Sequence, residues 1–441
     1  MRDVILTAII FGMLPFCFSN PVLGTYVWAW LGMMSPHRAT YGFAYNLPFA
    51  QVVAITTLLA FAFSRQRRPL PVNTITVVLL MLLGWMCVTS VFALNDADIV
   101  LDRVVFFGKI QLMLFVTLML VRGRRDIERL IWVVSFSVGF YGIKGGIWTV
   151  LSGGSIRIFG PTGSLIEENN GLAIALVMMV PFVAYLYQVT KQKLLQRGLL
   201  FCLVTIGLSI LGSQSRGALL ALLTMATMLG FKSQRPVRVT VLLAVLVGLA
   251  IAFMPDSWTS RMETIQTYEA DNSAMSRVYT WQTLWNLALD RPIVGAGFRT
   301  DTPAIFARYA PFDGSAMSNG GVLVAHSIYF QALGEHGFPG LFLFVLLGIV
   351  SWRKAGQLTK LTLGDPEFGD WVPLLMPMVQ VSLLGFAVGG AFLSMMQFDI
   401  PYYIIGYVVM VDATVRDRLK ARALGLPPVP GSAQIQPLQP T

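Results

Sequence analysis

The sequence predicts an all-α polytopic membrane protein, and three observations support this fold class. Hydrophobic residues make up 55% of the 441 residues. Charged residues make up only 12%, whereas a typical soluble domain has about 25%. Several apolar runs reach the ~18 residues that indicate a transmembrane helix. Together these observations exclude a soluble enzyme, a disordered regulator and a coiled coil.

Apolar runs separated by turn signals predict about twelve transmembrane helices. The first is expected as a single span over 4–31, broken near Pro15 and Pro21. The others are expected at 48–63, 72–91, 104–121, 127–151, 171–189, 198–211, 217–231, 237–254, 338–353, 371–395 and 398–413.

These spans divide the chain into four parts. We expect an N-terminal transmembrane bundle of about nine helices at 1–254, followed by one large periplasmic loop with short helices at 255–337. C-terminal transmembrane helices are expected at 338–413 and a cytoplasmic tail at 414–441. The Pro, Gly and Gln content of this tail from about Leu424 predicts disorder.

Clusters of Lys and Arg predict the orientation, because cytoplasmic loops carry an excess of both. All clusters face the cytoplasm if an even number of spans separates each from the next, as the twelve spans allow. The clusters are Arg65, Arg67 and Arg68; Arg122, Arg124, Arg125 and Arg129; Lys191, Lys193 and Arg197; Lys232, Arg235 and Arg238; Arg353, Lys354 and Lys360; and Arg416, Arg418 and Lys420. Both termini are then cytoplasmic, provided that 4–31 is one span. Two spans there would move the N-terminus outside.

The net charge of +10 includes cations in the outer loops, where this rule does not explain them. They are Arg216, at the start of a helix, and Arg261, Arg277, Arg291, Arg299 and Arg308 in the long loop. The planar donor fork of arginine suits phosphate. Pairing with nearby Asp or Glu is the alternative for Arg261, Arg299 and Arg308. Arg216 lies beside apolar helix ends, where an arginine is costly without a partner or a function, and a helix N-terminus adds N–H donors for an anion.

Within the long loop, 273–290 is predicted to be an amphipathic helix. One face is expected to hold Met275, Val278, Trp285 and Leu289. Arg277 and Trp281 are four residues apart and therefore share a face. After this helix, Gly295 and Gly297 would allow the backbone to approach a ligand closely.

His326 begins the next predicted helix, which ends at Gly337. A histidine at the edge of an apolar bundle is a candidate general base, and a structural histidine is the alternative. Tyr329 follows one turn later. Glu335 and His336, at the far end of this helix, are expected to be structural.

Two further places leave alternatives open. Asn170 lies beside Glu168 at the start of a helix, where it either caps the helix or contacts a polar substrate. Asp96 and Asp98 form a DxD pair, which either holds a divalent metal that bridges a pyrophosphate or forms a solvated turn.

The chain resembles the O-antigen ligase superfamily of bacterial membrane glycosyltransferases in a set of short motifs and in their order around one large outer loop. The resemblance is carried by ENNGLA at 168–173, SRG at 215–217, RxxxW at 277–281, DRPxxGxG at 290–297, AHSxY at 325–329, GFPG at 337–340 and the stretch WAWLGMMSPHRATYGFAYNLPFA at 28–50. The stretch at 28–50 resembles a subgroup of O-glycosylation or polysaccharide ligases. Ser327 departs from the asparagine of many members, and Glu168 departs from the aspartate of the subgroup.

The resemblance implies a GT-C-like, inverting, metal-independent glycosyltransferase without a cofactor. Such enzymes work at the periplasmic face of the bacterial inner membrane. They transfer a glycan en bloc from undecaprenyl pyrophosphate to the lipid A core, so membrane lipids are partners and nucleic acid is not. The implied catalytic residues are His326, Arg216 and Arg277. Pyrophosphate or glycan binding is expected of Arg291, Trp281, Tyr329, Asn170 and Glu168.

Other functions use similar features. A surface-polysaccharide polymerase or a protein O-glycosylation ligase would use the same donor and differ only in the acceptor. A transporter for lipid-linked glycans is more remote, because its charged groups should line a path at mid-membrane depth. The outer location of the unexplained cations favours an enzyme.

Overall fold

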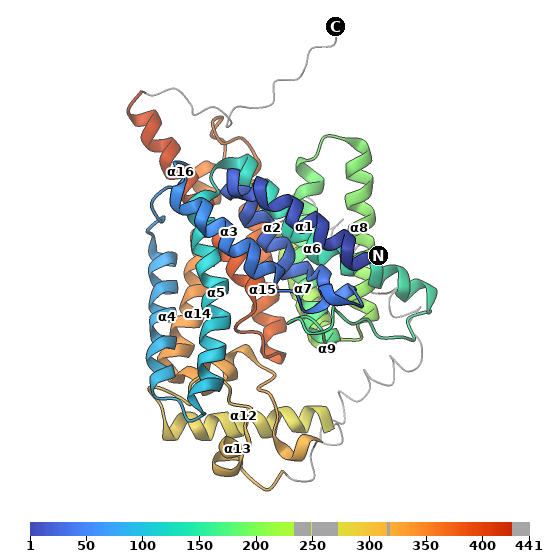
Figure 1. The fold of residues 1–441 in the computed structure, drawn as a ribbon, viewed down its shortest axis with the longest axis vertical. Helices are drawn as coiled ribbons and strands as arrows, with labels where there is room; N and C mark the ends of the chain where they lie inside the picture. The colour runs from blue at the N-terminus through green and yellow to red at the C-terminus, as the bar shows by residue number, and fades with distance from the viewer. Residues whose placement is uncertain (233–247, 249–271, 315–317, 426–441) are drawn as a thin grey trace.

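The computed structural model describes residues 1–232, 248, 272–314 and 318–425. Within these ranges all regular secondary structure is helical (Figure 1). Seven described helical segments are long and apolar enough to cross a membrane. They are α1 (Arg2–Ser19), α4 (Thr74–Val91), α6 (Gly123–Leu151), α7 (Asn169–Val189), α8 (Lys193–Gly212), α14 (Ile328–Thr362) and α15 with the following 3-10 turn (Trp371–Phe392). The chain is therefore an all-helical multi-pass membrane protein.

The remaining helices are shorter or more polar. They are α2 (Pro21–Met34), α3 (Phe49–Phe63), α5 (Ala97–Leu120), α9 (Arg216–Lys232), α12 (Asn272–Asp290), α13 (Pro303–Tyr309) and α16 (Asp399–Ala423), with 3-10 turns η1 (Pro36–Ala39), η2 (Phe43–Asn46), η4 (Ser318–Gly321) and η5 (Gly390–Phe392). The expected span at 237–254 lies outside the described residues except for residue 248. Helix α14 is interrupted at Gly337, whose φ of +67° and ψ of −173° are not helical, so the predicted end of one helix at Gly337 and the start of the next at 338 are confirmed. The second part is longer than the expected 338–353, because it continues to Thr362.

The segment expected as one broken span at 4–31 consists of two helices, and the break lies at the predicted Pro21. Two helices, α1 and α2, meet at Asn20, whose side-chain Oδ1 accepts a hydrogen bond from the Val22 N–H at 3.2 Å. At the other end of α1, Asp3 Oδ1 accepts hydrogen bonds from the N–H groups of Gly42 and Ala44, at 3.0 and 3.1 Å. The start of α1 therefore lies with the loop that follows α2.

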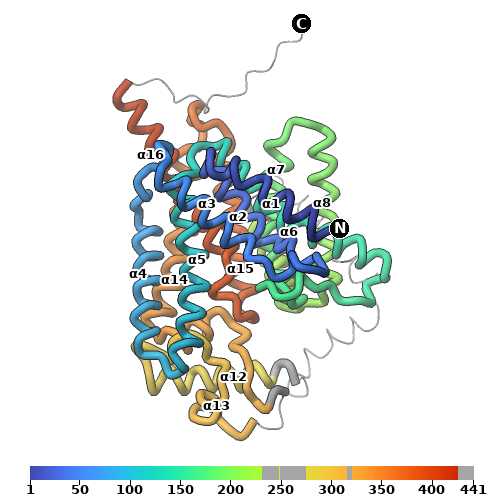
Figure 2. The backbone as a smooth tube through the Cα atoms, in the orientation of Figure 1, coloured from blue at the N-terminus to red at the C-terminus, as the bar shows by residue number. Residues whose placement is uncertain are grey.

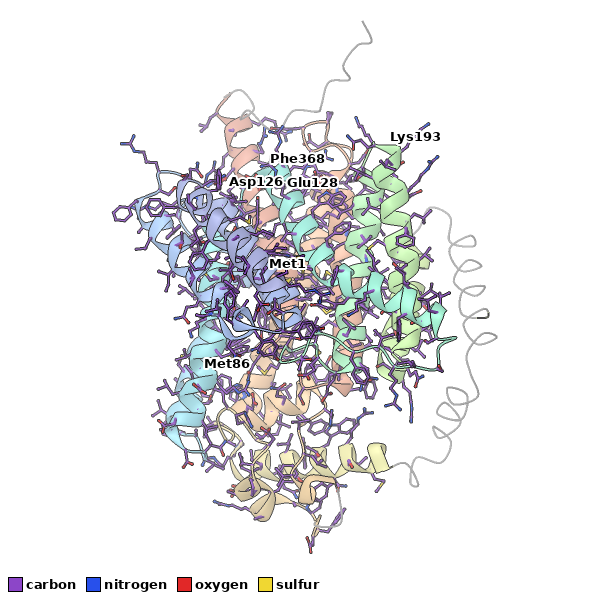
Figure 3. All side chains as sticks on the ribbon, turned by 45° about the vertical axis from the view of Figure 1, so that its right-hand side comes forward. Met1, Met86, Asp126, Glu128, Lys193 and Phe368 are labelled. Carbon is purple, nitrogen blue, oxygen red and sulfur yellow. The ribbon has the colours of Figure 1, made fainter. Side chains whose placement is uncertain are left out.

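The basic loops meet at one end of the bundle, here called the basic end. Asp412 of α16 pairs with Lys354 of α14 at 2.9 Å and with Arg416. Arg68 and Asp417 pair at 3.4 Å, which connects the loop after α3 with α16. Asp126, Glu128, Lys193 and Phe368 lie on this side in Figure 3, opposite α12. This arrangement agrees with the clustering expected from the loop charges.

Helices α7 and α15 pack against each other in the centre of the bundle, and α14 and α9 pack on α15. Helix α6 packs on α8 with a row of small residues. The backbones approach most closely at Gly146, where a Cβ atom would lie 2.1 Å from the carbonyl oxygen of Thr205. Close approach of this kind is how membrane helices associate without a hydrophobic driving force.

Replacing Gly146 with valine should lower the stability of the bundle, because the new side chain meets backbone that cannot rotate away. Overpacking of this kind costs about 1–3 kcal/mol. Thermal unfolding of the purified protein in detergent measures the effect. Gly207→Val on α8 is the control, since a Cβ there has no neighbour within 4 Å. Equal unfolding temperatures for the two variants would contradict the close α6–α8 contact.

Opposite the basic end, α12 and α13 lie across the ends of α4, α5 and α14 (Figures 1 and 2). We call this the outer end. Hydrogen bonds and packing contacts connect to it the loops at 92–96, 152–168 and 213–215 and the segment 390–398.

The expected amphipathic helix forms as α12, but the face with Trp285 and Leu289 is not its buried side. Trp285 and Leu289 are 46% and 60% exposed, whereas Tyr279, Leu284 and Leu287 are buried. The Trp285 ring contacts Phe338 of α14 edge-on, with ring centroids 6.0 Å apart. Exposed apolar side chains next to a membrane helix are expected where a helix lies at the membrane surface. The apolar residues of α12 therefore lie partly on its exposed side and partly against the protein.

Candidate active site

His326 lies at the outer end, immediately before α14. Its backbone has a φ of +44°, a conformation that costs about 1–2 kcal/mol for a residue with a Cβ atom. The His326 N–H donates a hydrogen bond to Ser394 Oγ at 2.7 Å. The next residue, Ser327, caps α14 by accepting a hydrogen bond from the Phe330 N–H at 3.4 Å. The backbone of His326 is thus held beside the helix start, and the residue is half-buried.

Helix α12 brings Arg277 and Trp281 to the same place. Trp281 Nε1 donates to the Ala325 carbonyl oxygen at 2.9 Å, which fixes the residue before His326. The indole also stacks on Phe330, with ring centroids 5.3 Å apart and planes 6° apart. Burial and the positive charge of Arg277 lower the pKa of His326 from 6.5 to about 4. His326 is therefore neutral at pH 7, as a proton acceptor must be.

Arg216 is the first residue of α9 and is half-buried. Ser215 Oγ accepts a hydrogen bond from the Ala218 N–H at 3.3 Å and so caps this helix. The preceding Gln214 has a φ of +55°. A tight turn between α8 and α9 therefore places Arg216 at the outer end of the bundle.

Two contacts join this turn to the loop before α7. Asn169 Nδ2 donates to the Ser213 carbonyl oxygen at 2.8 Å. Arg157 Nε donates to Gln214 Oε1 at 3.2 Å. The stretch 168–170 and the Arg216 turn, separated by more than forty residues in the chain, are thus neighbours.

The segment 390–398 connects these parts, and it was not predicted from the sequence. On one side, Phe392 lies 3.4 Å from where a Cβ of Gly217 would stand, next to Arg216. On the other side, Ile328 packs on Gly390, and Ser394 holds His326. The sequence did not indicate a separate segment here, because its first apolar residues were assigned to the end of the predicted span at 371–395. The glycine pair at 389–390, where α15 ends, was the available signal.

The structure does not bring all expected residues to this place. Arg291 follows α12, about 20 Å along the helix axis from Arg277, and donates to the carbonyl oxygens of Gly295, at 2.6 Å, and Phe92. Tyr329 donates to the Ala387 carbonyl oxygen at 2.8 Å and so connects α14 with α15.

Glu168 and Asn170 lie at the start of α7. Glu168 is exposed and precedes the helix without a side-chain capping bond. Asn170 is the second helical residue, so the capping alternative for it is wrong. Contact with a polar substrate stays open for both residues.

The close approach expected at Gly295 and Gly297 occurs, but toward the protein and not toward a ligand. Their φ values are +62° and +74°. A Cβ on Gly295 would lie 2.6 Å from the Gly334 carbonyl oxygen, and one on Gly297 would lie 2.5 Å from Ala93 Cβ. The Gly297 N–H donates to the Glu335 carbonyl oxygen at 2.9 Å. These glycines dock the loop on α14 and on the end of α4.

Two of the other outer arginines form ion pairs with nearby aspartates, which was the alternative to phosphate binding. Arg299 pairs with Asp301 at 2.9 Å, and Arg308 pairs with Asp290 at 3.1 Å. Arg261 lies outside the described residues. Asp96 precedes α5 and Asp98 lies in its first turn. In the described part of the chain, no group of three His, Cys, Asp or Glu side chains is placed to hold a metal ion.

Glu335 and His336 are buried, and His336 has the structural role that was expected. His336 Nδ1 shares a hydrogen bond with Thr89 Oγ1 at 2.7 Å, and its carbonyl oxygen accepts from Trp85 Nε1 at 2.9 Å. Glu335, in contrast, lines a cavity beside Ala325 and Ser394, the two residues that hold His326. The sequence did not predict this cavity, because six separate stretches of the chain form it.

Two family models match the chain. A model described as O-antigen ligase matches residues 199–345, a range that contains Arg216, Arg277 and His326. A model described as a family of unknown function matches residues 1–191. No curated protein matches the chain.

Proposed function

Because the chain belongs to the O-antigen ligase superfamily through residues 199–345, we propose that it transfers a glycan en bloc from undecaprenyl pyrophosphate to a sugar of the lipid A core. Membership supports a ligase or polymerase type of glycosyltransferase in general. The proposal adds the donor, the acceptor and an inverting mechanism without a metal. It also places the reaction at the periplasmic face of the bacterial inner membrane.

The observation that carries the proposal is the meeting of His326 with Arg277, in a place that the segment 390–398 also connects to Arg216. In the reaction, the acceptor hydroxyl oxygen bonds to the anomeric carbon of the donor sugar. The bond from that carbon to the pyrophosphate oxygen breaks, and undecaprenyl pyrophosphate leaves with the electron pair. His326 accepts the proton of the hydroxyl. A single base opposite the leaving group is sufficient for inversion.

The two arginines stabilise the charge that develops on the leaving group. Positively charged donors aimed at such charge are worth most in a site that excludes water. Arg216 also stands at the N-terminus of α9, whose first N–H groups favour an anion. In this proposal, the arginines provide the stabilisation that a metal ion provides in other phosphate sites.

An apolar groove suits the prenyl chain of the donor. The groove has a volume of about 370 Å³ and lies between α14, α15 and α16. It begins at Ile328 and Tyr329, just after His326, and extends to Trp352. A lipid in this groove would have its head at the outer end, beside the arginines.

The location of the charges favours an enzyme over a transporter. A transporter should carry its charged groups at mid-membrane depth, along the substrate path. In the described residues, the ion pairs gather at the basic end and in the outer loops. A polymerase or a protein O-glycosylation ligase remains the second candidate, because it would use the same donor and the same residues.

Reconstitution in liposomes tests the proposal. The purified chain is supplied with an undecaprenyl-pyrophosphate glycan and, in separate reactions, with lipid A core, a second donor glycan or a protein acceptor. We expect glycosylated lipid A core, and addition of a chelator should leave the rate unchanged. Product on the glycan or the protein alone would identify the polymerase or the protein ligase instead. Loss of activity with the chelator, restored by a divalent metal, would favour a role for Asp96 and Asp98.

The pH dependence of transfer follows from the low pKa of His326. The base must be neutral, and burial together with Arg277 lowers its pKa to about 4. The rate should therefore rise as the pH increases through about 4 and stay level up to neutral pH. Initial rates in liposomes of fixed composition measure this profile. An acid limb near pH 6.5, the ordinary pKa of histidine, would contradict the buried environment of the base.

A further inference from the structure

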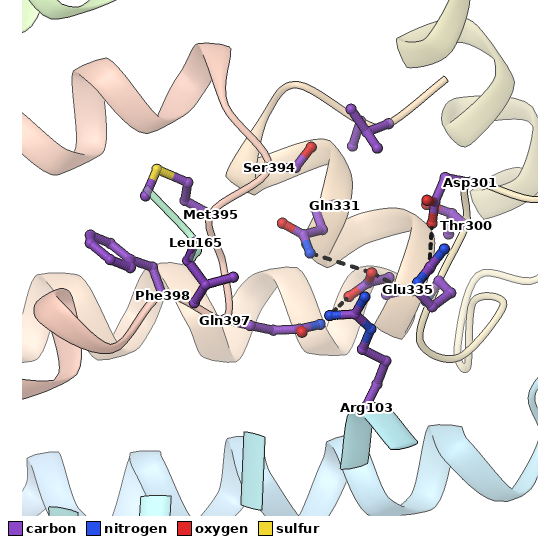
Figure 4. A pocket seen from close by; sticks show the side chains of 13 residues that line it. Arg103, Leu165, Thr300, Asp301, Gln331, Glu335, Ser394, Met395, Gln397 and Phe398 are labelled. Atoms are coloured by element: carbon purple, nitrogen blue, oxygen red, sulfur yellow. Dashed lines mark hydrogen bonds and ion pairs between the residues drawn. The ribbon is translucent and has the colours of Figure 1, made fainter. Parts of the chain in front are cut away.

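A polar cavity of about 280 Å³ lies at the outer end of the bundle. Six stretches of chain form it: the second turn of α5 with Arg103, the loop before α7 with Leu165, the loop at 299–301, the residues before His326, the first turns of α14, and the segment 394–398. Figure 4 shows Glu335 of α14 near the centre of its wall, with Gln331 and Gln397 beside it. None of these side chains has a part in the chemistry proposed for His326, Arg216 and Arg277.

Glu335 is a carboxylate with unused capacity to accept hydrogen bonds. It is only 4% exposed. Its Oε1 accepts from Gln331 Nε2 at 3.4 Å and from the Arg299 N–H at 3.3 Å, and its Oε2 accepts from Gln397 Nε2 at 3.3 Å. These bonds are longer than the usual 2.7–3.2 Å, and a carboxylate has about four acceptor sites. A group in the cavity that donates hydrogen bonds would complete its coordination.

The rest of the wall complements a molecule with both hydroxyl groups and C–H faces. Two side-chain amides and the guanidinium of Arg103, which extends from α5 toward Glu335 in Figure 4, offer donors. Leu165, Val324, Met395 and Phe398 supply apolar surface. The wall is thus mixed, with more polar than apolar residues, and its volume lies just below the roughly 300 Å³ at which small-ligand pockets begin. One sugar ring has this chemistry and this order of size.

The cavity also lies against the backbone of the proposed base. Ala325, which precedes His326, and Ser394, which accepts the His326 N–H, both line it. We propose that this cavity is a subsite for a single sugar ring of one of the two glycan substrates, held by Glu335, Gln397 and Arg103 next to His326. The inference rests on the proposed function, since it assigns a place to one of that reaction's sugars. The ring comes from the acceptor or from the donor glycan.

Steady-state kinetics of two cavity variants tests the subsite. Glu335→Gln removes the charge with little change in shape. Arg103→Ala changes a half-buried residue near the start of α5 and should leave the fold intact. Each should raise the KM of one substrate about 10- to 100-fold, the effect of losing a hydrogen bond to a charged group, with a much smaller change in kcat. The substrate whose KM rises is the source of the ring. Arg308→Ala is the matched control, an exposed arginine away from the cavity.

Binding measured without turnover separates this inference from the proposed function. Saturation-transfer NMR detects binding of lipid-free core oligosaccharide and of lipid-free donor glycan to the His326→Ala protein. We expect one of the two to bind, and the signal to fall in His326→Ala proteins that also carry Arg103→Ala or Glu335→Gln. Binding without any transfer by wild type would retain the subsite and overturn the proposed function. Transfer by wild type, with neither binding nor KM changed in the variants, would overturn the subsite alone.

Discussion

Replacing His326 with alanine should lower the rate of glycan transfer by about 10²- to 10⁴-fold, the usual contribution of a positioned general base. The reason is the position of the imidazole, which is neutral at pH 7 and lies beside Arg277. Initial rates with saturating donor and acceptor measure the loss. His37→Ala is the control, because His37 is a second half-buried histidine, placed in the loop after α2.

A glycine variant separates chemistry from folding at this position. Since His326 has a φ of +44°, His326→Gly removes the strain that alanine would keep. It should lose as much activity as His326→Ala and unfold at a temperature no lower than that of the alanine variant. Near-normal transfer by either variant would rule out His326 as the base.

Replacing Arg277 with methionine should lower the rate by about 10²- to 10³-fold, the usual effect of removing one group that stabilises developing charge. Arg216→Met should have a similar effect. Arg277→Lys retains the charge and loses the planar fork, so it should be intermediate. Single-turnover rates with preloaded donor measure these effects apart from product release.

The same variants should change the pH profile in a way that a purely structural role would not. The positive charge of Arg277 is the second cause, after burial, of the low pKa of His326. Removing that charge makes the protonated imidazole less unfavourable, so the pKa should rise and the acid limb should move to higher pH. Arg277→Lys should leave the limb near that of wild type. If the acid limb of the pH–rate profile lay at the same pH in the methionine and lysine variants, the effect of the Arg277 charge on His326 would be contradicted.

Most of the membrane helices could be predicted from the sequence, because a long apolar run with few charges is rare outside a transmembrane helix. At 4–31 the sequence predicted breaks near Pro15 and Pro21, and only the second of them occurs. In the structure, Pro15 lies inside α1, and Pro21 is the first residue of α2 after the Asn20 cap. A proline after a capping residue marks a helix start.

The meeting of Arg277 and His326 could also be predicted, since both lie near outer helix ends in one loop. The cavity around Glu335 could not. A structural role was predicted for Glu335 because it stands at the end of a short predicted helix. Its environment depends on Gln397, Arg299 and Arg103, which are distant in the chain. Periodicity describes single helices, and it carries no information about which helix ends converge.

The face of α12 shows a limit that is specific to membrane proteins. In a soluble protein, an apolar stripe on a helix indicates the core. Here Trp285 and Leu289 are exposed beside α14, and the buried side of the helix includes Thr280 and Thr283. Lipid takes up apolar side chains as readily as a protein core does. The hydrophobic pattern therefore could not distinguish the two.

A quantitative balance of one reconstituted reaction tests the proposed chemistry at its centre. Undecaprenyl pyrophosphate released from the donor and glycan joined to lipid A core are measured together, for wild type and for His326→Ala. We expect one undecaprenyl pyrophosphate for each glycan transferred by wild type, with an inverted anomeric configuration. Both products should be almost absent with the variant. Wild-type levels of both products from His326→Ala, or retention of configuration with wild type, would contradict a mechanism in which His326 is the single base.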